Sequence, residues 1–243
     1  MSTDIPSNAP AEFYDKGEHL PDQLPDSPFG IFQDWYDQAW EKRITPNTNA
    51  MTLATINEDG FPDARIVLCK AIHPDPGAVV FYTNYNGAKG KQLAKTPFAS
   101  AVFHWDQYER QVRVRGPVVH ATEAESEAYF ASRKLESRLG AWISDQSQPI
   151  ESRAALLEKA AETIDKLGLD ASALLNGDES LVVPRPPHWG GFRIYAQSME
   201  LWAGGVGRVH DRARWTREVT ANDQGADGDG YAFGPWSSTR LQP

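Results

Sequence analysis

The stretch Met199-Glu-Leu-Trp-Ala-Gly-Gly-Val-Gly-Arg-Val-His-Asp-Arg212, near the C-terminus, is the most informative part of this sequence. Its glycines are followed by Arg208, His210 and Arg212 at alternate positions. Alternation is the period of a β-strand, so these three side chains are predicted to share one face. Two guanidinium groups and an imidazole on one face could hold a small anion and support proton-sensitive chemistry. An edge strand with a solvated basic face would explain the same spacing.

The composition is that of an ordinary globular protein, with 40% hydrophobic and 23% charged residues in 243. No run approaches the roughly 18 apolar residues of a membrane span, and no secretory signal is evident at the N-terminus. Cys69 is the only cysteine, which excludes an intrachain disulfide and fits a reducing compartment. We therefore expect a cytoplasmic protein with no membrane partner.

The charge distribution limits the class of ligand. A formal net charge of −9 argues against nucleic-acid binding, which needs a basic surface. A small phosphorylated ligand needs only a local group of cations. Arginines are indeed clustered in two segments, at positions 110, 113 and 115 and at positions 208, 212, 214 and 217.

Periodicity predicts a mainly β protein with peripheral helices (α+β). Residues 1–25 are rich in Pro and acidic residues and are predicted to form a mobile or draped arm, with residues 26–243 as a single domain. Many strands in short hairpins with few helices indicate a small β-barrel. Strands are predicted over 50–56, 62–72, 78–83, 100–105, 110–121, 190–197, 198–202 and 208–217, and helices over 28–42, 89–95, 122–132 and 150–166.

Two groups of residues could bind phosphate. Arg65, Thr83 and Lys89 offer a guanidinium fork, a hydroxyl and an ammonium, a set suited to a phosphate monoester. Tyr129 and Arg133 are four residues apart on a predicted helix and, with Ser137, could hold a second phosphate. Charged ends of a barrel strand and a solvated helix face are the structural alternatives for the two groups.

Other kinds of site find less support. Gln111 can donate and accept hydrogen bonds at once, which suits the edge of a flavin ring but equally a surface strand. The glycines near residue 205 lack the strand-to-helix context of a dinucleotide-binding fold. The six histidines show no paired ligand spacing, so no metal site is expected.

Taken in order, these segments resemble the pyridoxine/pyridoxamine 5'-phosphate oxidase family from about Leu24 to Pro243. The resemblance implies an FMN-binding split β-barrel that works as a homodimer with flavin sites at the interface. The matching motifs are Arg65 to Lys70, Phe81 to Asn84, Glu109 to Val112, Tyr129 to Arg133 with Ser137, Gly140 to Ser147, Trp189 to Phe192 and Glu200 to Arg212.

The resemblance also implies site residues, carried over by matched position. Arg208 and His210 would be the catalytic residues over the pyridine ring. Lys70, Tyr129, Arg133 and Ser137 would bind the substrate phosphate. The cofactor FMN would be held by Arg65, Ile66, Val67, Leu68, Lys70, Tyr82, Thr83, Lys89, Gln111, Gln146, Ser147, Trp202 and Arg212. The implied reaction oxidises pyridoxine or pyridoxamine 5'-phosphate to pyridoxal 5'-phosphate, with molecular oxygen as acceptor and hydrogen peroxide as by-product.

Two departures from the family pattern stand out. Gly87-Ala88-Lys89 replaces a frequent Ser-Arg-Lys, so one phosphate-binding guanidinium is missing, and the N-terminal arm is acidic where relatives tend to be basic. Two alternatives remain: a split-barrel flavin oxidase acting on another ring, such as a phenazine precursor, and a non-catalytic flavin-binding protein. The phosphate-binding set around Arg133 argues against the first, and the pair Arg208 and His210 argues against the second.

Overall fold

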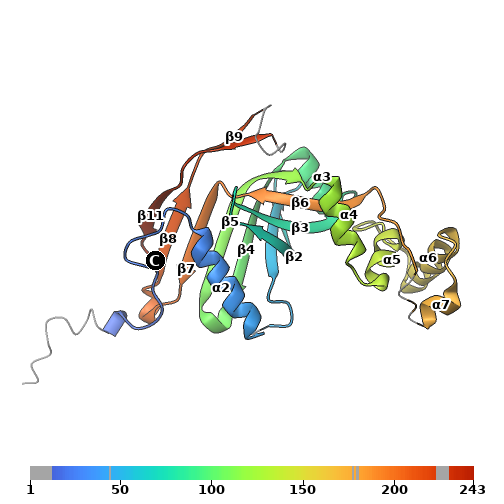
Figure 1. The fold of residues 1–243 in the computed structure, drawn as a ribbon, viewed down its shortest axis with the longest axis horizontal. Helices are drawn as coiled ribbons and strands as arrows, with labels where there is room; N and C mark the ends of the chain where they lie inside the picture. Colours follow the sequence, from blue (N-terminus) through green and yellow to red (C-terminus); the bar gives the residue numbers. More distant parts are fainter. Residues whose placement is uncertain (1–12, 44, 177, 179–180, 223–229) are drawn as a thin grey trace, which may run out of the picture.

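The computed structural model describes residues 13–43, 45–176, 178, 181–222 and 230–243. Within these residues the main sheet has nine strands in the order β11-β8-β7-β5-β4-β1-β2-β3-β6, and β6 also pairs with the end of β5. The strands are β1 (Ala50–Ile56), β2 (Pro62–His73), β3 (Ala78–Asn84), β4 (Phe98–Trp105), β5 (Arg110–His120), β6 (Trp189–Tyr195), β7 (Ser198–Ala203), β8 (Asp211–Thr216) and β11 (Ser237–Leu241). The β5–β6 pairing closes part of the sheet into a barrel, while β7, β8 and β11 extend beyond it (Figure 1).

Long strands that change partner allow this closure. The register between β2 and β3 shifts between Cys69 and Ala71, where the chain passes from pairing with β1 to pairing with β3. On β5, residues 110–117 pair with β4, and residues 118–120 pair with β6. The predicted mainly β barrel is confirmed, and the predicted bounds of β1 to β7 differ from the observed ones by at most two residues.

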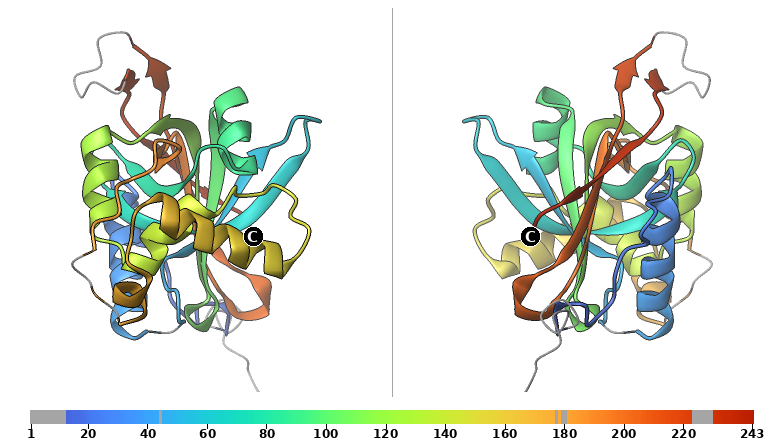
Figure 2. Two further views of the ribbon diagram at one scale, coloured as in Figure 1. Left: turned by 90° about the vertical axis from the view of Figure 1, so that its right-hand side faces the viewer. Right: turned by 90° about the vertical axis from the view of Figure 1, so that its left-hand side faces the viewer.

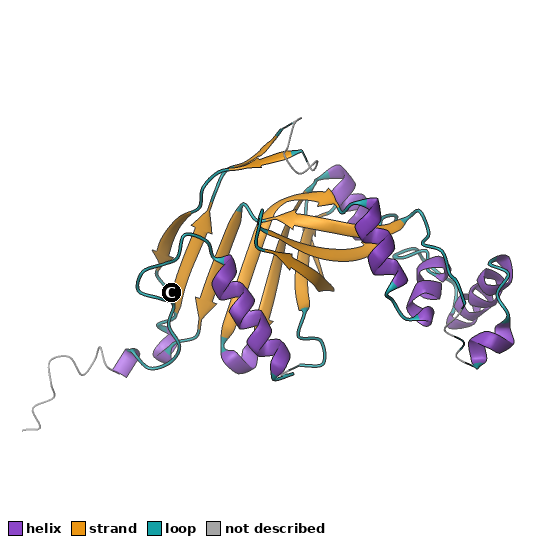
Figure 3. Ribbon diagram, in the orientation of Figure 1, coloured by secondary structure: helices purple, strands orange, loops and turns teal. Residues whose placement is uncertain are grey.

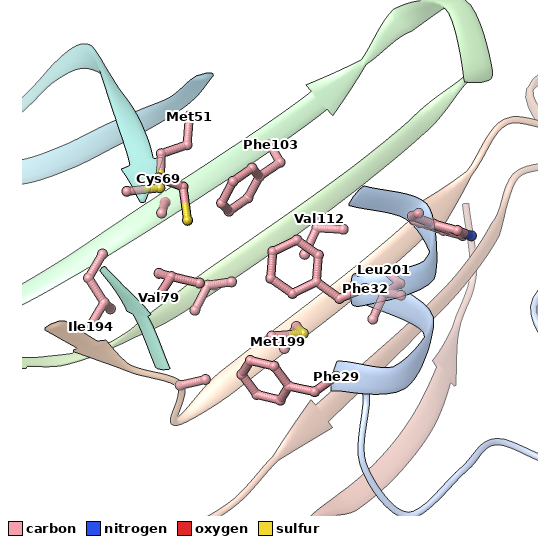
Figure 4. Packing of buried hydrophobic residues seen from close by; sticks show 14 of the residues in the cluster. Phe29, Phe32, Met51, Cys69, Val79, Phe103, Val112, Ile194, Met199 and Leu201 are labelled. Carbon is pink, nitrogen blue, oxygen red and sulfur yellow. The ribbon is translucent and has the colours of Figure 1, made fainter. Parts of the chain in front are cut away.

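The core is formed by inward-facing residues of the strands together with residues of helix α2 (Phe29–Glu41), which packs against them (Figure 4). Phe29 and Phe32 face inward from the helix, and the ring centroid of Phe32 lies 5.0 Å from that of Phe103 on β4. On the strands, Val112 and Leu201 contribute fully buried side chains to the same cluster. The predicted helix over 28–42 is thus confirmed, together with the core role of its aromatic residues.

A Phe32→Ala variant is expected to lose about 3–5 kcal/mol of unfolding free energy, because the fully buried ring leaves a cavity against Phe103. Urea denaturation followed by circular dichroism measures the loss. Phe61→Ala is the matched control, since the Phe61 side chain is 68% exposed. Equal losses in the two variants would contradict the packing described here.

Helices α4, α5, α6 and α7 lie at one end of the molecule, on the right of Figure 1 and in purple in Figure 3. Thr122 and Glu125 form a capping box at the start of α4, which confirms the predicted N-cap. The predicted helix over 150–166 begins at Arg153, after its cap Ser152. The remaining helices are α3 (Ala88–Lys95), α4 (Glu123–Ala131), α5 (Leu135–Ile143), α6 (Arg153–Lys166) and α7 (Ala171–Leu175), of which α5 and α7 are not predicted by the sequence pattern.

The prediction of one strand over 208–217 is wrong at its start. Residues Val206–Arg208 form a single 3₁₀ turn, and β8 begins only at Asp211. Gly207 and Arg208 have φ angles of 63° and 68°, a left-handed conformation that ends an extended strand. Arg208 and His210 therefore lie in the β7–β8 connection, and they do not share a strand face with Arg212.

The described part of the predicted arm lies along the sheet. Leu20 is 2% exposed, and the Glu18 carboxylate accepts hydrogen bonds from Arg110 on β5 at 2.6 and 2.8 Å. Gly17 forms an isolated bridge with Gly205 in the β7–β8 connection. The first half of the arm, residues 1–12, lies outside the described residues, so the division into arm and domain stays a prediction.

A second, two-stranded sheet projects from the barrel as a hairpin, at the top of both views in Figure 2. Its strands are β9 (Val219–Ala221) and β10 (Tyr231–Phe233). Arg217 holds its base to the barrel, because the guanidinium lies 4.6 Å from the Phe233 ring centroid and donates to the carbonyl oxygen of Ala196. Within the described residues, no helix is both long and apolar enough to cross a membrane.

Candidate functional site

A cavity of about 610 Å³ opens where β2 and β3 meet helices α3, α4 and α5. It brings together eight of the predicted FMN contacts and the whole predicted phosphate-binding set. The lining residues are Ile66, Val67, Leu68, Lys70, Tyr82, Thr83, Asn84, Lys89, Tyr129, Arg133, Lys134, Ser137, Gly140, Ala141, Ser144, Gln146 and Trp189.

One end of the cavity holds a buried ammonium. Lys89, from the first turn of α3, is 9% exposed and donates to Gln146 Oε1 at 2.7 Å and to Thr83 Oγ1 at 3.1 Å. Both acceptors are neutral, and the described residues contain no carboxylate within ion-pair distance of Lys89 Nζ. Burial, and secondly the nearby charge of Arg65, lower the pKa of Lys89. A buried cation without a carboxylate is suited to binding an anion.

A second cationic group lines the same cavity, after helix α4. Arg133 follows the helix end, and its Nη1 is buried without a hydrogen-bond partner among the described residues. Tyr129 lies one turn earlier, and the ammonium of Lys70 lies 5.7 Å from its ring centroid. Ser137, on α5, lines the same space. Hydroxyls and free cationic donors in one concave place are the donor set that a phosphate requires.

Aromatic rings form the wall between the two cationic groups. Tyr82 stacks on Tyr129 with ring centroids 4.0 Å apart, and on Trp189 at 5.5 Å. Burial raises the pKa of Tyr82, so its hydroxyl keeps its proton at neutral pH. Flat apolar surface beside charged ends is the form expected of a pocket for a ring compound that carries a phosphate.

Arg65 does not line this cavity, although the sequence groups it with Thr83 and Lys89. Its Nη2 pairs with the Asp63 carboxylate at 2.5 Å and also donates to Gln92 Oε1 at 3.1 Å. Because Asp63 lies two residues away on the same face of β2, it neutralises the guanidinium locally. The structure therefore brings Lys89 and Thr83 together in the cavity, whereas Arg65 lies outside the cavity lining.

The remaining predicted site residues lie outside the cavity. Gln111 on β5, Trp202 on β7 and Arg212 on β8 are successive cross-strand partners, so their side chains share one face of the sheet. These residues lie on β5, β7 and β8, whereas the strand residues that line the cavity lie on β2, β3 and β6. Ser147, with a φ of 71°, lines two neighbouring cavities instead.

His210 is held in a defined orientation beside this second group. Its ring centroid lies 4.5 Å from that of Trp202, and its Nδ1 accepts a hydrogen bond from the Gly205 backbone N–H at 3.1 Å. With Nδ1 as acceptor, the neutral ring carries its proton on Nε2. Arg208 is exposed on the same connection. One chain thus presents two separate half-sites: the cavity, and the Trp202–His210 group (Gln111, Trp202, Arg208, His210 and Arg212).

Several cavity residues have no role predicted from the sequence. Trp189 lies within the matching motif Trp189 to Phe192, but the sequence pattern gives it no role of its own. Such roles depend on contacts between distant segments, which no local pattern displays. The residues missed are Asn84, Lys134, Gly140, Ala141, Ser144 and Trp189. The described residues contain no group of three His, Cys, Asp or Glu side chains that could hold a metal ion.

Comparison with known families gives two matches. A family model described as pyridoxamine 5'-phosphate oxidase matches residues 37–167. A second model, described as the pyridoxine 5'-phosphate oxidase C-terminal dimerisation region, matches residues 189–243. The first match contains every cavity residue except Trp189, and the second contains Trp189, Trp202, His210 and Arg212.

Individual relatives agree with these matches. The pyridoxine/pyridoxamine 5'-phosphate oxidase of Methylibium petroleiphilum is 44% identical over 230 residues, which is 95% of each chain. The crystal structure of PhzG from Burkholderia lata 383, in complex with tetrahydrophenazine-1-carboxylic acid, gives a TM-score of 0.75 at 26% identity over 93% of this chain and 99% of that one. A pyridoxamine 5'-phosphate oxidase-related, FMN binding protein from Nostoc punctiforme shares the fold, with a TM-score of 0.61 at 16% identity over 89% and 98% of the two chains.

Proposed function

The chain belongs to the pyridoxine/pyridoxamine 5'-phosphate oxidase family of FMN-dependent oxidoreductases, and we propose how its residues divide the work of that reaction. The reaction is oxidation of pyridoxine or pyridoxamine 5'-phosphate to pyridoxal 5'-phosphate. The observation that carries the assignment is a cavity lined by two cations that have no carboxylate partner among the described residues, Lys89 on α3 and Arg133 after α4. Two such cations suit a reaction in which cofactor and substrate each carry a phosphate.

The residues around Lys89 fit FMN. Its buried ammonium, with Thr83 and Gln146 as hydrogen-bonding neighbours, would hold the FMN phosphate, and strand residues 66–68 would lie along the ring. The departure at Ala88 removes one guanidinium from this end. Held here, FMN would supply the redox chemistry: acceptance of two electrons from the substrate carbon and their transfer, with two protons, to molecular oxygen to give hydrogen peroxide.

The other residues bind and orient the substrate. Arg133, with Tyr129, Ser137 and Lys70, would hold the substrate phosphate at the α4 end of the cavity. We assign to Arg208 the orientation of the pyridine ring. His210 would bind the ring substituents and move a proton at Nε2, since Nδ1 is occupied by the Gly205 N–H.

A homodimer would complete the site. The dimerisation region includes β7 and β8, whose shared face carries Trp202 and Arg212. In a two-fold dimer each copy presents the same surface to the other, so the Trp202–His210 group of one copy can reach the cavity of its partner. This arrangement explains why one chain holds the two half-sites on different strands of its sheet.

One structural relative favours a second candidate, oxidation of another ring. The PhzG structure is in complex with a tetrahydrophenazine carboxylic acid, which has no phosphate. In this chain Arg133 keeps a buried guanidinium nitrogen without a hydrogen-bond partner among the described residues, beside Tyr129 and Ser137. That set supports a phosphorylated substrate over a ring carboxylate.

Absorbance spectroscopy tests the proposal. Protein loaded with FMN should lose its visible flavin bands when pyridoxamine 5'-phosphate is added without oxygen, and regain them in air. Flavin that stays oxidised with this substrate and with pyridoxine 5'-phosphate, but bleaches with a tetrahydrophenazine carboxylic acid, would support the second candidate instead.

Replacement of Lys89 tests the cofactor end of the cavity. Lys89→Met should raise the dissociation constant of FMN about tenfold, because a charge-assisted hydrogen bond to the phosphate is lost. In the wild type, affinity should also fall as the pH rises through the lowered pKa of Lys89, because the ammonium loses its charge. Fluorescence titration of FMN measures both effects, with exposed Lys95→Met as control. An unchanged dissociation constant in Lys89→Met would remove Lys89 from the phosphate site.

A further inference from the structure

We propose that Trp189 is a positioning residue for the substrate phosphate, acting through Arg133 and Tyr129. The inference rests on the proposed function, since it concerns the phosphate-binding end of the same cavity. Trp189 is the first residue of β6, is 6% exposed and lines the cavity. Its ring is the common neighbour of the two side chains that would bind the phosphate.

The ring supports the Arg133 guanidinium, whose Cζ lies 4.5 Å from the Trp189 ring centroid. The described residues contain no ion pair for Arg133, and its Nη1 is buried without a hydrogen-bond partner there. Burial lowers the pKa of Arg133, which records the cost of holding this charge away from water. In a cation–π contact the face of the ring stabilises the positive charge of the guanidinium. Unlike a carboxylate, the ring does not accept hydrogen bonds from the guanidinium N–H groups.

The contrast with neighbouring arginines shows why an aromatic support matters. Arg185 pairs with Glu123 and Glu127, and Arg193 pairs with Glu125 at 2.5 Å. A carboxylate beside Arg133 would occupy its donors and repel a phosphate dianion. Trp189 holds the guanidinium without adding negative charge, so both the positive charge and the donors remain for the ligand.

The same ring orients Tyr129. The planes of Tyr129 and Trp189 differ by 11°, with centroids 6.1 Å apart, and the Tyr82 ring lies in contact with both at 4.0 and 5.5 Å. Three nearly parallel rings restrict the side-chain rotation of Tyr129. Its hydroxyl is thereby held on the cavity wall that Arg133 also faces.

Trp189 is itself fixed to the helix that carries the phosphate-binding residues. Arg185 Nη1 donates to the Trp189 carbonyl oxygen at 2.6 Å, while Arg185 also pairs with Glu127 on α4. The indole packs edge-on against Phe130, again on α4, at 5.0 Å. Backbone and ring are thus both fastened to α4, so the position of Trp189 determines where Arg133 lies relative to the cavity.

The test uses the FMN-loaded enzyme with Trp189→Leu and Trp189→Phe. Trp189→Leu should raise KM for pyridoxamine 5'-phosphate about tenfold with kcat within about twofold, and should weaken pyridoxal 5'-phosphate binding in equilibrium dialysis by a similar factor. The KM of Trp189→Phe should lie between those of Trp189→Leu and the wild type, because a smaller ring still supports the guanidinium. Trp236→Leu is the matched control: its ring also lies under an arginine, Arg217, at 4.4 Å, but away from the cavity.

A double-mutant cycle with Arg133→Ala separates positioning from a general structural role. If Trp189 acts through Arg133, adding Trp189→Leu to Arg133→Ala should raise KM little further. Fully additive effects, or a loss of kcat with unchanged KM, would overturn the inference. An Arg133→Ala enzyme with unchanged KM would instead overturn the phosphate assignment of the proposed function, and this inference with it.

Discussion

Replacing Gly205 by alanine is expected to lower kcat/KM at least about a hundredfold. A Cβ at this position would lie 2.0 Å from the carbonyl oxygen of Val209, and backbone atoms cannot yield as a flexible side chain does. The β7–β8 connection must therefore shift, and with it both Arg208 and His210. The Gly205 N–H that orients the His210 ring moves as well.

Steady-state kinetics on the FMN-loaded variant measure this loss, and thermal denaturation shows whether the barrel is retained. Gly30→Ala is the matched control: Gly30 is exposed on α2, and an added Cβ would meet nothing within 4 Å. That control should keep full activity and gain slightly in stability, by up to about 1 kcal/mol. A Gly205→Ala enzyme with normal kcat/KM would show that the connection takes no part in the site.

Arg133→Ala should raise KM for pyridoxamine 5'-phosphate about a hundredfold. The variant removes charge-assisted hydrogen bonds worth roughly 1.5–3 kcal/mol each, and kcat should change much less because the phosphate is remote from the reacting carbon. Inhibition by inorganic phosphate should weaken in parallel. The control is Arg153→Ala, which removes an exposed guanidinium at the start of α6. A fall in kcat at unchanged KM would place Arg133 in a different role.

Much of the fold is readable from the sequence, because its signals are local. Alternating side chains mark β5, where Val112 and Val114 are buried and Arg113 is exposed. The Thr122 to Glu125 spacing marks the beginning of α4 by a capping box that closes within four residues. The family resemblance then predicts the split barrel and the FMN-binding residues, which periodicity alone does not contain.

The failures have physical causes that a local pattern does not reveal. Arg208, His210 and Arg212 alternate as a strand would, but two left-handed residues turn the chain before β8 begins. The assignment of Arg65 to FMN stays a prediction, and in this structure its guanidinium pairs with Asp63. Trp189 contacts residues more than fifty positions earlier, so its neighbours become visible only in the folded chain.

Each active site is proposed to take its parts from two copies of the chain, and complementation between variants tests this arrangement. Arg133→Ala and Arg208→Ala are each expected to be nearly inactive at low substrate concentration. The two variants are unfolded together and refolded as an equal mixture. Half of the dimers should then be mixed, with one copy of each variant, and each mixed dimer should contain one intact site.

The mixture is therefore expected to recover about one quarter of wild-type activity, with mixed dimers verified by mass spectrometry. If verified mixed dimers show no more activity than the separate variants, Arg133 and Arg208 of one site come from the same copy, and the shared-site account is wrong.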